Sequence, residues 1–286
     1  MSYRSIFRPG LFDGRVYIVT GGGSGIGRCT AHELASLGAQ VAIVGRDPGK
    51  LARVAAEIAA EGHRASTYAC DIRDEPSVIA TVEAVLAAHG RIDGLVNNAG
   101  GQYFSPLKDI TTKGFEAVVR SNLTGGFIFM REVYARWMEH HGGAIVNITA
   151  DMWNGLPGVA HSGAARAAMT SLTETAACEW SGAGVRVNSV APGLIASSGF
   201  DNYTGEVARD ILGYVRAIPA QRFGNVAEVA AAIAFLLSPA SAFINGTCLR
   251  VDGAAPNARR SWPLQAHSRS EPFNGFHLDS LPQLLK

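Results

Sequence analysis

Short, almost uniformly apolar runs alternate along this chain with longer segments of helical period, and this alternation restricts the possible fold more than any other feature. Runs that are apolar throughout are typical of strands covered on both faces of a sheet. The longer segments carry apolar residues at three- and four-residue spacing, as helices do. Repeated strand–helix–strand units of about 30 residues therefore predict an α/β domain, with a doubly wound parallel sheet of about seven strands and helices on both faces. The expected strands are Arg15–Thr20, Gln40–Gly45, Arg64–Cys70, Ile92–Asn97, Ala144–Thr149, Val185–Val190 and Thr247–Val251, and the expected helices are Gly25–Leu37, Asp47–Glu61, Glu75–His89, Thr112–His140 and Ser162–Ser181.

The composition narrows the class of protein further. The chain has 286 residues, of which 47% are hydrophobic, and 25 basic side chains stand against 24 acidic ones. This balance excludes a disordered protein and removes the usual electrostatic basis for binding nucleic acid or an anionic membrane. No apolar stretch is long enough to cross a bilayer, and the first residues lack the apolar core of a secretion signal. We therefore expect a cytoplasmic protein whose partners include neither nucleic acid nor membrane.

The four cysteines are far apart in the sequence and show no metal-binding spacing. They are Cys29, Cys70, Cys178 and Cys248. Most of them lie in apolar segments, so we expect reduced thiols in the core or on helices, and no metal site.

A glycine-rich turn joins the first expected strand to the first expected helix. It reads TGGGSGIG from Thr20 to Gly27. Glycines at such a turn let backbone N–H groups approach a pyrophosphate, whose charge is favoured by the helix N-terminus. A tight structural turn is the alternative, but the strand–turn–helix context favours the nucleotide. The sequence therefore predicts a dinucleotide site at Gly21, Ser24, Gly25, Ile26 and Gly27.

Residues after the next strands extend this predicted site. An acidic residue ending the second strand would bind the ribose 2′-hydroxyl of NAD, but Arg46 stands there and suits the 2′-phosphate of NADP. Asp47 either caps the following helix or reaches the ribose. We therefore expect NADP(H) to be preferred, with NAD(H) possible. Asp71 and Ile72 follow the third strand, where an adenine would lie, and Asn98, Ala99 and Gly100 follow the fourth.

The periodic pattern stops at Asp252-Gly253. We expect residues 1–253 to form one dinucleotide-binding and catalytic domain. Residues 254–286 carry four of the 12 prolines and three aromatic residues, Trp262, Phe273 and Phe276, without periodicity. We expect an irregular tail that these aromatic residues anchor to the domain or to a neighbouring subunit.

Several motifs occur in the order found in the short-chain dehydrogenase/reductase family. After TGGGSGIG come DI, NNAG, SNLTG, IVNIT and VNSVAPG, and the match runs from Gly14 to about Gly253. The chain therefore resembles this family, which implies a single Rossmann-like domain, a nicotinamide cofactor, and a homotetramer or dimer packed through two long helices. The resemblance also implies that Pro192, Gly193 and Ile195 border the nicotinamide and that Leu194–Arg222 forms a substrate lid.

The chain departs from the family at its usual catalytic pair, Tyr-x-x-x-Lys, which is absent. Ser162 stands at the Tyr position, Arg166 at the Lys position and His161 one residue before Ser162, whereas Asn122 is retained. The position of the usual catalytic serine falls on Thr149 or Ala150. The HSGAARA pattern resembles the corresponding segment of the trans-2-enoyl-CoA and 2,4-dienoyl-CoA reductases and of citronellol/citronellal-type dehydrogenases. The tail resembles the second group more than the first.

The chemistry of these residues favours conjugate reduction over alcohol oxidation. Ser162 does not easily become an alkoxide, and Arg166 does not act as a base. Reduction of a C=C bond asks only that fixed donors stabilise an enolate, and Ser162 can donate to it. The proton for the α-carbon would come from water, from Asp151, whose apolar setting would raise its pKa, or from His161. Structural alternatives are an Asx turn or helix cap for Asp151 and core packing for His161.

We therefore expect an NADP(H)-dependent oxidoreductase that reduces the α,β-double bond of an enoyl-CoA of fatty-acyl type. Asn122, Ser162 and Arg166 would arrange cofactor and oxyanion, and Trp153 and Phe200 would line an apolar acyl or prenyl pocket. Tyr103, at the rim, either faces the substrate or packs. A terpenoid alcohol or aldehyde dehydrogenase, with Asp151 or His161 as base, is the first alternative. A non-catalytic NADP-binding sensor or assembly partner is the second.

Overall fold

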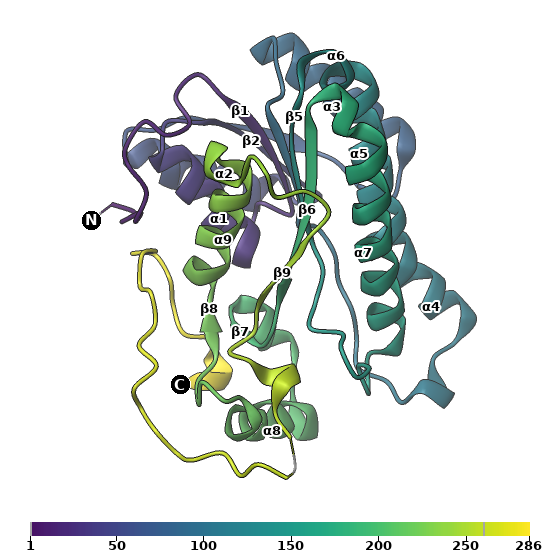
Figure 1. Ribbon diagram of the computed structural model, residues 1–286, viewed down its shortest axis with the longest axis vertical. Coiled ribbons are helices and arrows are strands. Elements are labelled where there is room, and N and C mark those ends of the chain that lie inside the picture. The colour runs from purple at the N-terminus through teal and green to yellow at the C-terminus, as the bar shows by residue number, and fades with distance from the viewer. Residues whose placement is uncertain (1, 260) are drawn as a thin grey trace.

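The sheet has seven parallel strands in the order β3-β2-β1-β4-β5-β6-β9, which confirms the expected fold class (Figure 1). The computed structural model describes residues 2–259 and 261–286. The strand order reverses between β1 and β4, and the carboxyl ends of strands at such a point border the crevice where α/β sheets bind ligands. The strands of the sheet are β1 Val16–Thr20, β2 Gln40–Gly45, β3 Ala65–Ala69, β4 Gly94–Asn97, β5 Gly143–Ile148, β6 Val185–Pro192 and β9 Cys248–Val251.

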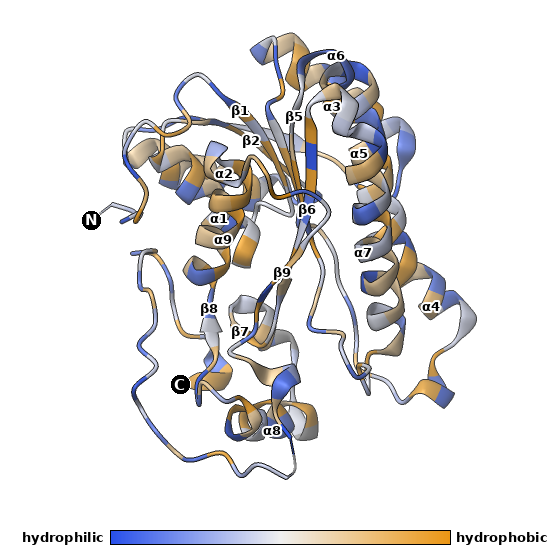
Figure 2. Cartoon of the chain, in the orientation of Figure 1, coloured by the Kyte–Doolittle hydropathy of each residue, from blue (hydrophilic) through white to orange (hydrophobic). Residues whose placement is uncertain are grey.

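Helices cover both faces of the sheet, and each face has its own apolar core (Figure 1). Helices α1, α2 and α9 pack on one face, and α3, α5 and α7 on the other. In Figure 2 the central strands are largely orange, whereas the helices alternate between orange and blue, because only one side of each helix is buried. The helices are α1 Gly25–Ser36, α2 Pro48–Ala60, α3 Glu75–His89, α4 Thr112–Val119, α5 Gly125–Val133, α6 Glu139–His141, α7 Ala160–Trp180, α8 Gly205–Tyr214 and α9 Val226–Leu237.

The segment expected to be one helix, Thr112–His140, is instead interrupted by two π-helical turns. These are η2 (Arg120–Thr124), between α4 and α5, and η3 (Tyr134–Met138), between α5 and α6. A π turn inserts an extra residue into a helix and often occurs at functional sites. Asn122 lies within the first of them and is buried. The apolar spacing predicted the helical path of this segment but not its interruptions.

The segment that the family resemblance expects to be a substrate lid, Leu194–Arg222, follows β6 and stands apart from the main sheet; we call it the lid. The two short strands β7 (Ile195–Ala196) and β8 (Gly224–Asn225) pair in parallel at its base. Between them come the turn η5 (Ser198–Asn202), helix α8 and the turn η6 (Val215–Ala217). These elements occupy the lower part of Figure 1.

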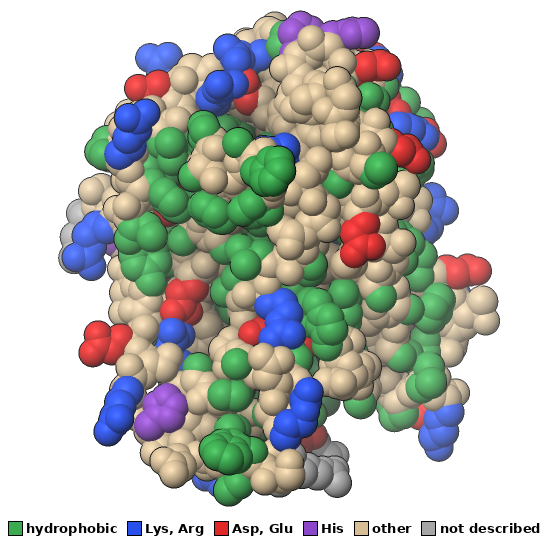
Figure 3. All heavy atoms as spheres, in the orientation of Figure 1, with side chains coloured by type: hydrophobic (Ala, Val, Ile, Leu, Met, Phe, Trp, Pro, Cys, Tyr) green, Lys and Arg blue, Asp and Glu red, His purple; other side chains and the backbone are tan. Residues whose placement is uncertain are grey.

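The tail runs from the end of β9 past α8, along the side of the molecule, and back toward β8 (Figure 1). It contains two short turns, η8 (Ala255–Asn257) and η9 (Gln283–Leu285). Phe276 is buried in the core of the α1 face, whereas Trp262 is 75% exposed. Trp262 therefore does not anchor the tail to its own domain, whereas Phe276 does. Figure 3 shows acidic and basic side chains interspersed over the face along which the tail runs.

All four cysteines are free thiols, and of these Cys178 is exposed on α7. Within residues 2–259 and 261–286, no helix is long and apolar enough to span a membrane. The same residues contain no group of three or more His, Cys, Asp or Glu side chains suited to hold a metal.

Candidate active site

A cavity of about 590 Å³ opens above the carboxyl ends of β1 to β4. The glycine turn forms the floor of this cavity. Gly21 and Gly25 in this turn adopt φ values of +67° and +52°, in the left-handed region that glycine tolerates best. A Cβ at Gly25 would meet no atom nearer than 3.9 Å, so only the absence of a side chain keeps this part of the cavity open. The predicted residues that line it are Gly21, Ser24, Gly25, Ile26, Arg46, Asp71, Ile72, Asn98, Ala99 and Gly100.

Hydrogen bonds from β4 fix the shape of the glycine turn. The hydroxyl of Thr20 accepts from the backbone N–H groups of Asn98 and Ala99, both at 3.0 Å. The side-chain amide of Asn98 donates to the carbonyl oxygens of Thr20 at 3.0 Å and of Gly21 at 3.4 Å. The NNAG motif therefore holds the turn in a preformed conformation.

Gly27 does not line the cavity but packs beneath it, in the first turn of α1. A Cβ there would lie 2.4 Å from the carbonyl oxygen of Gly21, so Gly27→Ala must displace the turn. We expect this substitution to weaken NADPH binding more than tenfold and to destabilise the fold by about 1–3 kcal/mol, the usual cost of overpacking. Fluorescence titration and thermal unfolding measure the two effects. Gly182→Ala is the control, because a Cβ at Gly182 meets nothing within 4 Å; equal effects in both variants would contradict this explanation.

Basic side chains gather at the far end of the cavity. Arg46, Lys50 and Arg73 all line it. Asp47 lines the cavity as well, and its Oδ1 caps α2 by accepting a hydrogen bond from the backbone N–H of Lys50 at 3.1 Å. The structure thus shows the helix cap and also places Asp47 on the cavity wall, so the cap does not exclude a contact with the ribose.

Asp71 is held by its neighbour Arg73, which donates to both carboxylate oxygens at 2.6 to 3.1 Å. The hydrogen bonds from Arg73 lower the pKa of Asp71 to about 2. The carboxylate is therefore ionised at neutral pH and neutralised by Arg73. Lys50 and Arg73 follow the ends of β2 and β3 closely in the sequence but belong to no motif, so the sequence did not single them out; the fold brings the two strand ends side by side.

A second polar group lies behind Gly100 and Gly101 of the cavity wall, where η2 meets α7, and its residues Asn122, Ser162 and Arg166 do not themselves line the cavity. The side-chain amide of Asn122 donates to Ser162 Oγ at 3.2 Å, and its carbonyl oxygen accepts from the backbone N–H of Gly101 at 2.8 Å. Ser162 is 1% exposed. Because Asn122 donates to Oγ, the hydroxyl proton of Ser162 remains available to another acceptor.

Arg166 completes this group from one turn further along α7. It donates to the carbonyl oxygen of Ile148 at 2.6 Å, and its guanidinium lies so near Gly100 that a Cβ there would be 2.4 Å from Nη2. Burial lowers the pKa of Arg166 to about 10, so the group stays cationic at neutral pH. The structure thus brings together Asn122, Ser162 and Arg166, as the sequence predicted.

Thr149, at the position of the usual catalytic serine, turns away from this group. Its hydroxyl donates to the carbonyl oxygen of Val190 at 3.2 Å and lies 3.7 Å from Cys248 Sγ. Thr149 is buried and serves the contact of β5 with β6. Ser162 is therefore the hydroxyl that Asn122 orients.

His161 is fully buried next to Ser162. Its Nδ1 accepts the backbone N–H of Ser162 at 2.8 Å, so the neutral ring carries its proton on Nε2. Among the described residues, Nε2 has no hydrogen-bond partner. The ring packs at 4.5 Å, nearly perpendicular, against Tyr103, which lines the cavity and is 40% exposed. His161 is thus a donor without an acceptor, beneath the rim residue Tyr103.

Asp151 lies beyond the end of β5, where its carboxylate feels the charges of Arg250 and Asp252. Burial and the charge of Asp252 raise the pKa of Asp151 to about 6, against the opposing effect of Arg250. Its backbone N–H donates to the carbonyl oxygen of Pro192 at 3.0 Å. None of the described residues donates a hydrogen bond to its carboxylate, as an Asx turn or helix cap would require. Asp151 is therefore an acid that changes charge near neutral pH.

The remaining predicted positions lie next to the cavity rather than on its surface. Pro192 ends β6, and Gly193 packs so closely on β9 that a Cβ would lie 2.8 Å from Asp252 Cα. Ile195 lines a second cavity of about 370 Å³ on the other side of β7.

The two expected pocket aromatics are both packed against neighbours. Phe200 is 7% exposed and contacts Phe223, and the guanidinium of Arg250 covers the ring of Trp153 at 5.2 Å.

Comparison with known proteins identifies the family. The family described as enoyl-(acyl carrier protein) reductase matches residues 21–254. The peroxisomal 2,4-dienoyl-CoA reductase of Danio rerio is 36% identical over 88% of this chain and 85% of its own length, and the probable 2,4-dienoyl-CoA reductase of Bacillus subtilis (strain 168) is 34% identical over 84% and 95%. The chain therefore belongs to the short-chain dehydrogenase/reductase family and is an NAD(P)-dependent oxidoreductase.

Solved structures of dehydrogenases and reductases are similar to the chain over most of its length. The citronellol catabolism dehydrogenase AtuB of Pseudomonas aeruginosa PAO1 is 56% identical, with a TM-score of 0.80, over 89% of this chain and all of its own. A levodione reductase is 31% identical, with a TM-score of 0.83, over 87% of this chain and all of its own. The chain is thus similar both to dienoyl-CoA reductases and to a citronellol catabolism dehydrogenase.

Proposed function

We propose that this enzyme uses NADPH to reduce the α,β-double bond of a 2-enoyl-CoA substrate of fatty-acyl type. The observation that carries the proposal is the group of Asn122, Ser162 and Arg166, which offers fixed donors and a cation but no phenol or amine that could accept a proton at neutral pH. The similarity to 2,4-dienoyl-CoA reductases supports it.

The cavity fits a nicotinamide dinucleotide, because the glycine turn leaves room that any side chain at Gly25 would fill. The proposed contacts are the glycine turn for the pyrophosphate, Asp71 and Ile72 for the adenine, and Pro192, Gly193 and Ile195 for the nicotinamide. When bound, the reduced cofactor supplies a hydride. We assign NADPH rather than NADH to the site because Arg46 and Lys50 line the cavity where β2 ends, whereas the cap of α2 engages one oxygen of Asp47 and Arg73 pairs with Asp71.

The residues of the site would act on the substrate as fixed electrostatic groups. Ser162 donates its hydroxyl proton in a hydrogen bond to the thioester oxygen, where negative charge develops as hydride reaches the β-carbon. Asn122 keeps Ser162 in the donating orientation, and the cationic Arg166 lowers the energy of the enolate. A group held in place before the reaction needs no reorganisation, and removing one such donor typically costs a factor of about 10²–10³ in rate.

The α-carbon must then receive a proton, which we assign to Asp151. Because its pKa is raised to about 6, its protonated form is populated below that pH and is lost above it. We therefore expect kcat/KM for enoyl reduction to fall about tenfold per pH unit above about pH 6. Asp151→Asn should lower the rate and remove this break from the profile. If the break in the pH profile persists in Asp151→Asn, another group donates the proton, and His161 is the next candidate.

A terpenoid alcohol or aldehyde dehydrogenase is the second candidate, favoured by the 56% identity to the citronellol catabolism dehydrogenase. Alcohol oxidation needs a base, and Asp151 or His161 would have to supply it. With Asp151 as base, the rate would rise with pH through about 6, opposite to the expectation for reduction.

An absorbance assay of NADPH distinguishes these candidates. Crotonyl-CoA and a longer 2-enoyl-CoA are offered with NADPH, citronellal with NADPH, and citronellol with NADP⁺ and NAD⁺. The proposal expects turnover with the enoyl thioesters. Turnover of citronellal and citronellol alone would favour the terpenoid dehydrogenase instead. Tight NADPH binding without turnover of any of these substrates would favour a sensor or assembly partner.

We further propose a cytoplasmic homo-oligomer, a tetramer or dimer packed through the α5 and α7 faces. Phe127 on α5 supports this packing, because its ring is 40% exposed beneath the guanidinium of Arg131 and a second subunit would cover it. Sedimentation of the purified chain measures the subunit count.

A further inference from the structure

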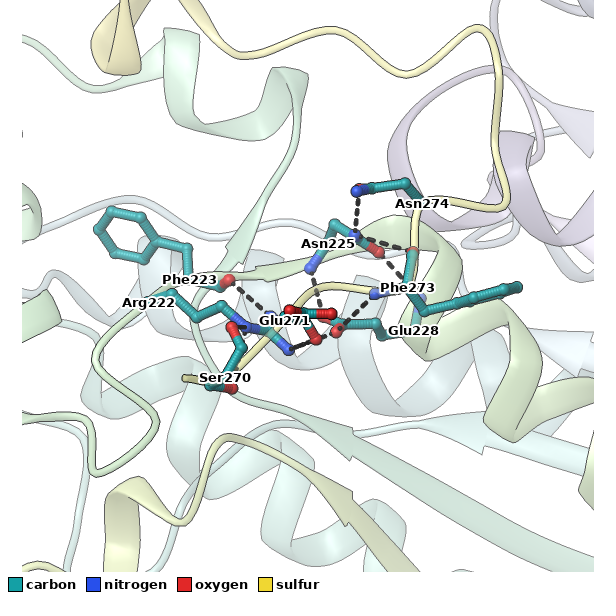
Figure 4. Close-up of polar contacts among 8 residues, drawn as sticks. All are labelled: Arg222, Phe223, Asn225, Glu228, Ser270, Glu271, Phe273 and Asn274. Atoms are coloured by element: carbon teal, nitrogen blue, oxygen red, sulfur yellow. Dashed lines mark hydrogen bonds and ion pairs between the residues drawn. The ribbon is translucent and has the colours of Figure 1, made fainter. Parts of the chain in front are cut away.

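The tail lies outside the family match, which ends at residue 254, yet side chains of the domain bind its backbone closely. Arg222, just before β8, is the centre of this contact (Figure 4). Its Nε donates to the backbone oxygen of Ser270 at 2.9 Å and to its hydroxyl at 3.1 Å, and Nη2 donates to the backbone oxygen of Glu271 at 3.3 Å. Nη2 also pairs with Glu228 at 2.6 Å.

Glu228 and Asn225, which together cap α9, extend this contact along the tail (Figure 4). Glu228 accepts from the backbone N–H of Phe273 at 3.3 Å. The side-chain amide of Asn225 donates to the backbone oxygen of Phe273 at 3.0 Å and to Asn274 at 3.3 Å. A helix cap already needed for folding thus also binds the tail.

The next tail residues reach the α1 face. Phe276 is buried, with the guanidinium of Arg28 5.1 Å above its ring and the ring of His32 at 5.0 Å. His277 lies 3.5 Å from Glu61, at the end of α2. The middle of the tail is therefore fixed to the body of the domain at two places.

From this fixed middle, the tail returns to the lid. The backbone N–H of Gln283, the first residue of η9, donates to the carboxylate of Asp201 in η5 at 2.6 Å. Among the described elements, η9 is the main packing partner of η5. On its inner side η5 is held by Phe200 against Phe223 and by Tyr203 against Phe104.

The opposite side of η5 belongs to the cofactor cavity. Ser197, Ser198 and Gly199 line the cavity, and Ser197 faces the open Cβ position of Gly25 at 3.9 Å. The turn η5 thus contacts the C-terminal turn η9 through Asp201 and lines the cavity through Ser198 and Gly199. The contact with η9 is therefore positioned to restrict movement of this part of the cavity wall.

We propose that residues 261–286 form a strap that holds η5 against the cofactor cavity and slows release of the bound nucleotide. Arg222, Asn225 and Glu228 fix the strap to the domain, and Asp201 connects its end to the wall of the cavity. Asp201 is a positioning residue, because it acts on the nucleotide only through η5. This inference rests on the proposal that the cavity binds NADPH.

Two variants break the contact at the lid without touching the anchoring residues. Asp201→Ala removes the acceptor, and a deletion of Pro282–Lys286 removes the donor together with η9. Asp201→Asn keeps an acceptor oxygen and is expected to retain most of the contact. Asp210→Ala, a neighbouring exposed carboxylate on α8, is the matched control.

Hydrogen exchange of the chain without nucleotide and stopped-flow release of NADPH test the strap. Asp201→Ala should speed both amide exchange in η5 and NADPH release by about three- to tenfold, and the deletion should speed both by about tenfold or more. Asp210→Ala should leave both rates unchanged. Unchanged exchange or release in the deletion variant, in a chain that binds NADPH, would overturn this inference alone. A wild-type chain that binds no NADPH would overturn the proposed function and this inference together.

Discussion

Replacing Ser162 with alanine is expected to lower kcat for enoyl-CoA reduction by roughly 10²–10³, because the substrate oxygen loses its oriented donor. The Asn122 amide would lose its acceptor but keep its contact with Gly101, so the shape of the site should survive. Affinity for NADPH should change little, since the hydroxyl acts at the reacting centre. A loss confined to kcat is the mark of a group that interacts in the transition state.

Steady-state kinetics with crotonyl-CoA, together with an NADPH titration, measures both quantities. Ser171→Ala is the matched control, because Ser171 lies on the same helix and is exposed. We expect the control to behave as wild type. A Ser162→Ala enzyme with an unchanged rate would remove this hydroxyl from the mechanism and leave Arg166 as the main stabilising group.

Replacing Arg46 with aspartate is expected to weaken NADPH binding by roughly 10- to 100-fold and to leave NADH binding equal or improved. The substitution exchanges a partner of the 2′-phosphate for a repelling charge, whereas a carboxylate can accept a hydrogen bond from the ribose 2′-hydroxyl of NADH. Lys50 and Arg73 still line the cavity, and they limit the loss.

Titration of the variant with both reduced cofactors gives the ratio directly. Arg64→Asp changes the net charge equally and controls for long-range electrostatics, because Arg64 precedes β3 at the amino ends of the strands, whereas Arg46 follows the carboxyl end of β2. An Arg46→Asp variant that keeps its NADPH affinity would show that the assignment of the 2′-phosphate to this end of the cavity is wrong.

The sequence predicted the sheet well because its central strands are buried on both faces and are therefore apolar throughout. Gln40–Gly45 has the expected bounds, and β1 and β5 differ by single residues at their ends. The glycine turn was equally predictable, since its function requires residues adjacent in the chain. Local patterns thus suffice where the physical constraint is itself local.

Much of the rest of the site depends on contacts between distant segments. Asn122 meets Ser162 only when η2 packs on α7, and Arg73 comes near Arg46 only when β3 lies beside β2. The hydroxyl of Thr149 bonds to β6, which its sequence neighbours do not indicate.

The tail was the least predictable part. It has no period, and its anchoring residues, among them Arg222 and Glu228, lie about 50 residues away in the chain. The aromatic residues did not indicate which of them packs on the domain: Phe276 is buried there and Trp262 is exposed, because an aromatic side chain is buried only where the fold provides a surface for it.

The most direct test of the central claim follows the hydride. NADPH deuterated at the transferred position is incubated with the enzyme and crotonyl-CoA, and the products are analysed by mass spectrometry; a parallel reaction contains citronellal. The account predicts butyryl-CoA with one deuterium on its β-carbon. Unreacted crotonyl-CoA, together with citronellol that carries deuterium on its hydroxyl-bearing carbon, would contradict it and show that this site reduces C=O rather than C=C bonds.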